Sequence, residues 1–137
     1  MANHWLAVSG VLGGAGVGLG AFGAHALRLW LPLQKITIFE TAVRYHLLHA
    51  LALFGTAILL ELFPDHTRGL GRIAALYLAG VVLFSGGLYG FALTDQGWLA
   101  WLAPFGAALW VVAWFALAWI FLPRRGDRRA RPLRRGR

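Results

Sequence analysis

The chain has 137 residues, of which 59% are hydrophobic and only 13% are charged, a composition that excludes an ordinary soluble domain. Its formal net charge of +8 comes mainly from residues 124–137, which hold eight arginines and one aspartate, so the basic character belongs to one end and does not indicate a nucleic-acid-binding domain. The absence of cysteine excludes disulfides and thiolate metal sites.

Four long apolar runs predict four transmembrane helices. Residues 5–27, 73–94 and 96–122 each lack formal charges over the roughly 20 residues that cross a bilayer. The second run is uncharged only over residues 45–60, and it reaches that length if its helix begins near Thr41 and continues past Glu61 to Phe63. In lipid the backbone groups must hydrogen-bond within their own segment, so the runs predict helices. The sequence therefore predicts an all-α membrane protein. We expect a compact four-helix bundle in residues 1–123, with approximate spans 5–27, 42–63, 72–94 and 98–122, and a flexible tail in residues 124–137.

The first run is unusually rich in glycine. Gly10, Gly14 and Gly18 recur every four residues and share one helix face, which would let another membrane helix approach closely. Gly86 and Gly90 give the third run a similar small surface. We interpret these five glycines as helix-packing residues, either within the chain or against a partner.

The connector between the first and second runs is mixed in character. Residues 28–41 include the charged Arg28 and Lys35 together with the apolar Ile36 and Phe39. The segment is long enough to form an interfacial helix that lies along the membrane surface, with its apolar side chains against lipid or protein.

The second run opens with a dense group of polar side chains. His46 and His49 are three residues apart and are expected to face the same way on a helix. Glu40 lies four residues before Arg44, the favourable order for an ion pair. This entry to the second span is therefore the first place to look for chemistry.

Polar residues from other runs are predicted to meet these histidines on the outer side of the membrane. The candidate cluster consists of His25, Glu40, Tyr45, His46, His49, Ser85 and Tyr89. Three of its members, His25, His46 and His49, are candidate metal ligands. Two histidines could instead hold a haem, or the group could relay protons. The alternative is that these side chains hydrogen-bond one another and only fix the register of the helices.

The arginine-rich tail predicts the orientation of the chain. Lysine and arginine that flank membrane helices remain in the cytoplasm, so we expect both termini on that side. The connector that contains Arg68 and Arg72 agrees with this orientation, whereas residues 28–41 do not. Basic residues at a membrane surface attract anionic lipids, and we expect this role for Arg124, Arg125, Arg128 and Arg129.

Four blocks of sequence carry a family resemblance: residues 20–27, 39–50, 83–89 and 103–106. Together they resemble the bacterial family known as domain of unknown function 423, which is similar to the eukaryotic transmembrane protein 256. The resemblance implies a small multi-pass protein of the bacterial inner membrane. The chain departs from the family pattern at two positions. The family typically has glutamine or a similar residue in place of Arg44, and a second glycine in place of Ala107.

No pattern in the sequence indicates an enzyme. We find no serine–histidine–acid spacing, phosphate loop or paired carboxylate, so we expect neither catalysis nor a cofactor. The expected function is that of an accessory or assembly component of a membrane complex. The alternative is a protein that handles a small ligand, a metal, a haem or protons through the histidine cluster. Besides the bilayer, the candidate partners are other membrane proteins or a second copy of the chain, and no nucleic acid is expected.

Overall fold

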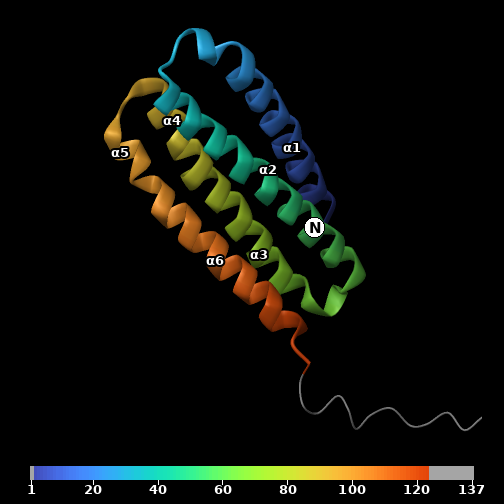
Figure 1. Ribbon diagram of the computed structural model, residues 1–137. Helices are drawn as coiled ribbons and strands as arrows, with labels where there is room; N and C mark the ends of the chain where they lie inside the picture. The colour runs from blue at the N-terminus through green and yellow to red at the C-terminus, as the bar shows by residue number, and fades with distance from the viewer. Residues whose placement is uncertain (1, 124–137) are drawn as a thin grey trace, which may run out of the picture.

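The computed structural model describes residues 2–123, which form helices joined by short turns (Figure 1). The prediction of four membrane-crossing helices is confirmed, because four helical stretches are long and apolar enough to span a bilayer. Their elements are α1 Ala2–His25 and η1 Leu27–Leu29; then α2 Leu33–Leu62; then η2 Pro64–His66, α3 Thr67–Gly80, the π-helical η3 Val81–Gly86 and α4 Gly87–Thr94; and finally α5 Gly97–Ala100 and α6 Leu102–Phe121.

The spans lie side by side in chain order (Figure 1). Helix α1 packs on α2, α2 packs on the span formed by α3, η3 and α4, and α6 packs on α3 and η3. Helices α1 and α6 are therefore the outer helices. Only 17% of the membrane window of each outer span is buried, compared with 39% for α2, so both outer helices offer broad faces to their surroundings.

The main core lies where α2, α3 and α6 meet. It includes Leu53, Leu70, Ile73, Tyr77 and Trp110, all of them buried. Apolar side chains of α1 pack against the edge of this cluster. Because lipid is itself apolar, close packing rather than the exclusion of water must hold these helices together.

The α1–α2 connection differs from the prediction of a separate surface helix. Only the single turn η1 stands there, and α2 already begins at Leu33, about nine residues earlier than expected. Pro32 sets the start, because it has an extended backbone and its carbonyl oxygen accepts hydrogen bonds from the N–H groups of Lys35 and Ile36. Ile36 and Phe39 face the interior and are almost fully buried, so protein contacts recruit this segment into α2.

Within residues 2–123, the predicted glycine face of α1 does not pack against another helix. A Cβ atom added at Gly10, Gly14 or Gly18 would meet no atom of this part of the chain within 4 Å. The contact with α2 instead uses other glycines of the same helix: Gly16 lies against Leu47, Gly20 against Val43 and Gly23 against Phe39. In the third span, Gly86 is likewise open, whereas Gly90 lies against Leu99. The sequence of α1 contains more than one face of glycines, and the shape of the contacting surface of α2 decides which face packs against it.

Candidate functional site

The two central histidines lie in the middle of α2 and not at its outer end as predicted. Because α2 begins at Leu33, His49 stands about 24 Å along a helix that is about 45 Å long. Both side chains are buried, with 5% exposure for His46 and 3% for His49. The earlier start of α2 therefore moves His46 and His49 toward the centre of the membrane domain.

His46 points toward α1 and α4. Its Nδ1 atom lies 3.2 Å from the hydroxyl oxygen of Tyr89, and its ring lies beside Gly16. When the tyrosine hydroxyl donates this hydrogen bond, Nε2 of the imidazole carries the proton. Nε2 is buried beside the backbone of Leu12 without a hydrogen-bond partner among the described residues.

His49 points in a different direction, toward α3 and α6. Its ring stacks on the indole of Trp110, with centroids 3.5 Å apart and planes within 2° of parallel. Its Nδ1 lies 2.9 Å from the carbonyl oxygen of Tyr45, and the ring of Tyr45 also stacks with the indole at 5.9 Å. The indole Nε1 donates to the carbonyl oxygen of Tyr77 at 3.1 Å. The stack and the hydrogen bond to Tyr77 join α2, α3 and α6. Together with the contact between His46 and Tyr89, they define a group that we call the buried polar layer: His46, His49, Tyr77, Tyr89 and Trp110.

Ser85 adds a polar contact between α2 and the third span. It is completely buried in η3, and its hydroxyl donates to the carbonyl oxygen of Ala42 at 3.0 Å. Tyr45, His46, His49, Ser85 and Tyr89 thus lie around α2, but their contacts point to different neighbouring helices. Most of the polar atoms in this group bond to protein atoms, an arrangement that fixes the register of neighbouring helices.

His25 and Glu40 lie apart from the buried polar layer. His25 is exposed at the end of α1, and the carboxylate of Glu40 pairs with Arg28 at 2.9 Å. The predicted Glu40–Arg44 ion pair is therefore wrong. The fold brings Arg28, which lies just beyond α1, back over the first turns of α2, and the long-range partner replaces the local one.

The three candidate metal ligands do not meet. His46 and His49 face different neighbours, and His25 is at the end of α1. Across residues 2–123, no group of three or more histidine, cysteine, aspartate or glutamate side chains could hold a metal ion. In the described part of the chain, His46 and His49 do not face one common site. Proton transfer through the layer stays a prediction.

Tyr77 and Trp110 belong to the layer but not to the predicted cluster. Tyr77 is completely buried, lies 6.0 Å from the ring of His49, and has a hydroxyl group without a hydrogen-bond partner in the described chain. A tyrosine within a largely apolar run was the available signal, because its hydroxyl is costly to bury there. Its register opposite His49 follows only from the packing of α3 on α2.

Comparison with known proteins supports one family. The family model described as protein of unknown function (DUF423) matches residues 19–107. The UPF0382 membrane protein YwdK of Bacillus subtilis is 38% identical over 104 residues, which cover 74% of this chain and 81% of the relative.

Relatives from other bacteria extend the match. A UPF0382 membrane protein of Haemophilus influenzae is 31% identical over 119 residues, covering 87% of this chain and 94% of the relative. The UPF0382 inner membrane protein YgdD of Escherichia coli is 32% identical over 105 residues, covering 72% of this chain and 73% of the relative. No solved structure matches the chain.

Proposed function

We propose a function for this chain from its membership of the DUF423 family of membrane proteins. The protein is a non-enzymatic accessory component of a membrane complex, and it docks a transmembrane helix of a partner protein. The relatives are bacterial proteins named as membrane or inner membrane proteins, and the four apolar spans agree with those names. The accessory role and the docked helix are the parts that we add.

The outer face of α1 carries this proposal. Gly10, Gly14 and Gly18 are exposed there, with Ala7 and Ala21 on the same side of the helix. The three glycines leave open space within 4 Å, and α1 is an outer helix that packs mainly on α2. A flat surface of small residues allows the backbone of a second helix to come close, which strengthens van der Waals contact and weak backbone hydrogen bonds in lipid.

The buried polar layer supports a role without catalysis. Its side chains contact one another and the backbone across three helix interfaces: α2–α4, α2–α6 and α3–α6. The apolar hollows on the surface of the described chain are lined by other residues. A substrate would need an open path to reactive groups, whereas a docking protein needs rigid helices and accessible faces.

The docked helix can be tested with a bulky substitution on this face. Gly14→Leu is expected to reduce recovery of the intact complex from native membranes at least tenfold, because the leucine side chain holds the partner helix away. Ala108→Leu, at an exposed position of the other outer helix α6, is the matched control and should leave recovery unchanged. Native mass spectrometry of gently solubilised membranes measures the complex.

Site-specific photo-crosslinking identifies the contact face in the same experiment. A photoreactive residue at Ala21 should attach to the partner, and one at Ala108 should not. A wild-type chain that leaves its native membrane without any bound polypeptide would rule out the accessory role.

We also propose that both termini lie in the cytoplasm. Both ends of the described chain lie at the end of the bundle that contains the α2–α3 turn, near Arg68 and Arg72 (Figure 1). At the opposite end, Arg28 pairs with Glu40 and Lys35 pairs with Asp95, so two of the cations that opposed this orientation are neutralised. The predicted lipid-binding arginines 124, 125, 128 and 129 lie outside the described residues. A reporter fused after residue 137 should be active only in its cytoplasmic form, and a periplasmic signal would reverse the assignment.

A further inference from the structure

Arg44 lies deep within the membrane on the exposed side of α2. It stands about 5 Å from the midpoint of this helix, on the side of the α1–α2 turn. The middle of α2 is also the middle of the domain, because Trp110, near the midpoint of α6, lies against both His49 and Gly80, which is near the midpoint of the third span. Since each half of the hydrocarbon core is about 15 Å thick, the backbone of Arg44 is about 10 Å inside it.

The guanidinium of Arg44 has no anionic partner in the described part of the chain. Glu40, one turn away, pairs with Arg28. Asp95, the other acid at this end of the bundle, pairs with Lys35. A charged side chain that faces lipid at this depth is costly, even when it leans toward the headgroups. The exposed position of Arg44 therefore indicates a face that an anionic group covers in the assembled state.

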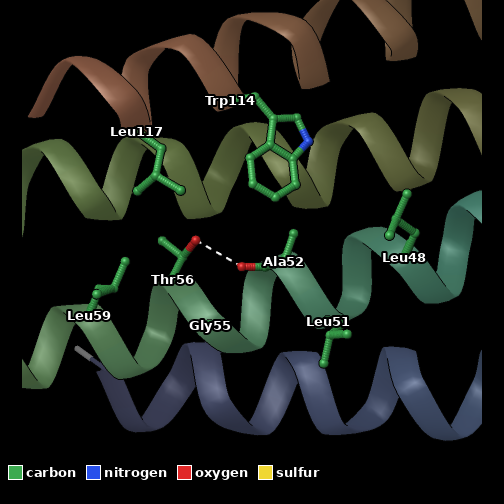
Figure 2. A pocket seen from close by; sticks show the side chains of 8 residues that line it. All are labelled: Leu48, Leu51, Ala52, Gly55, Thr56, Leu59, Trp114 and Leu117. Atoms are coloured by element: carbon green, nitrogen blue, oxygen red, sulfur yellow. Dashed lines mark hydrogen bonds between the residues drawn. The ribbon is translucent and has the colours of Figure 1, made fainter. Parts of the chain in front are cut away.

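An apolar groove continues the same face of α2 into the other half of the membrane. It begins at Leu48, one turn after Arg44, and follows α2 to Leu59 (Figure 2). Its other wall is formed by α6, and its volume is about 420 Å³. Gly55 keeps the groove open, because a Cβ atom there would meet nothing of residues 2–123 within 4 Å. Arg44 itself is outside the groove, so the charge and the groove lie on opposite sides of the midplane of the membrane.

A transmembrane helix of another protein fits this surface better than a lipid or a second copy of the chain. A lipid occupies one leaflet, so no single lipid contacts both Arg44 and the groove. A second copy packed symmetrically through the same surface would place two Arg44 side chains at the same depth, where like charges repel. A helix of another protein crosses both halves of the membrane, and one carboxylate on it can form a charge-assisted hydrogen bond with the guanidinium.

We propose that the exposed strip of α2 from Arg44 to Gly55 docks a transmembrane helix that carries an aspartate or glutamate at the depth of Arg44. The strip consists of Arg44, Leu48, Leu51 and Gly55, whose spacing of four, three and four residues is that of a seam between two helices at a small angle. Apolar side chains of the docked helix fill the groove beside α6. This strip is separate from the glycine face of α1, so the contact forms whether or not a helix docks on α1.

The test uses the purified full chain in phosphatidylcholine vesicles together with a model peptide. The peptide is a single helix of leucine and alanine with one glutamate about one turn from its centre, and a matched peptide has glutamine there. With a photoreactive residue in place of Leu51, the glutamate peptide should attach about tenfold more efficiently, because only the carboxylate forms a charged hydrogen bond with Arg44. The same photoreactive residue at Ala21, on the outer face of α1, should show no preference between the peptides and thus reports that face separately.

Variants of the arginine test the charge. Arg44→Gln should remove the preference for the glutamate peptide, and Arg44→Lys should keep part of it. Arg72→Gln, at an exposed arginine near the other end of the bundle, should leave the preference unchanged. Equal attachment of both peptides to the wild-type chain, or a preference that survives Arg44→Gln, would overturn the proposal.

A further variant tests the groove. Gly55→Leu places a side chain into open space, so the bundle should fold as before, as circular dichroism can check. Attachment of the glutamate peptide should fall several-fold, because the leucine side chain holds the docked helix away from α2. Unchanged attachment would place the peptide outside the strip and contradict the proposal.

Native membranes test the occupant itself. After irradiation of cells that carry the photoreactive residue at Leu51, mass spectrometry should find a membrane segment of another protein with an aspartate or glutamate at the depth of Arg44. This adduct should be lost with Arg44→Gln. Attachment to a second copy of the chain, to lipid alone, or to a helix without an acid at that depth would show that the strip has a different occupant.

Discussion

Gly106→Ala is expected to destabilise the folded membrane domain by about 3 kcal/mol, the upper part of the usual range for overpacking. A methyl group at this position would lie 2.5 Å from the backbone nitrogen of Phe84 and 2.9 Å from the carbonyl oxygen of Gly80. Both atoms belong to the backbone of the third span, so no side-chain rotation can relieve the clash. Helix α6 must move away from η3, which also separates Trp110 from its partners.

Gly14→Ala provides the control for this prediction. It makes the same chemical change on a helix, but its methyl group would meet nothing within 4 Å, and the better helix propensity of alanine favours it by up to about 1 kcal/mol. Equilibrium unfolding in mixed detergent and dodecyl sulfate, followed by circular dichroism, measures both variants. Equal stability of the two proteins would show that α6 does not approach η3 as closely as described.

Trp110→Ala is expected to cost about 3 kcal/mol of unfolding free energy, the lower end of the range for removing a buried tryptophan. The substitution removes the stack on His49, the contacts with Tyr45 and Phe84, and the hydrogen bond to the carbonyl oxygen of Tyr77. We choose the lower end because lipid can fill part of the space, and lipid is about as apolar as the side chain that is lost.

Trp119→Ala is the matched control, because this tryptophan belongs to the same helix but is 73% exposed. Its loss should change the unfolding free energy by less than about 0.5 kcal/mol. The same unfolding assay compares the two variants. If Trp110→Ala is no less stable than Trp119→Ala, the buried polar layer does not hold the bundle together.

The two predictions concern the same region, where α6 packs against α3 and η3. Close backbone contact at Gly106 brings α6 near enough for Trp110 to reach both His49 and Tyr77. The wide turn of η3 lies opposite this contact and also carries Ser85. The polar groups at the centre of the domain are therefore positioned by glycine packing, and the packing and the polar contacts should be lost together.

The sequence by itself determined the number and type of spans. Long runs without charge must become helices in lipid, since each backbone group needs a partner within its own segment. The same patterns marked His46, His49, Ser85 and Tyr89, because polar side chains are rare within apolar runs. The start of the second span was not determined in this way, because α2 begins at Leu33 and not near residue 42. Charged residues such as Lys35 suggested a break before the second span, although nothing in the backbone chemistry of residues 33–62 ends a helix.

Only the tertiary structure decided which of these residues meet. Helical periodicity placed His46 and His49 on one side of α2, but the neighbours packed there send one toward Tyr89 and the other toward Trp110. Glu40 forms its ion pair with Arg28 and not with Arg44. The glycines of α1 that face α2 are Gly16, Gly20 and Gly23. Such choices depend on the register between helices, which arises from the shapes of two surfaces in contact and is absent from the pattern along either one.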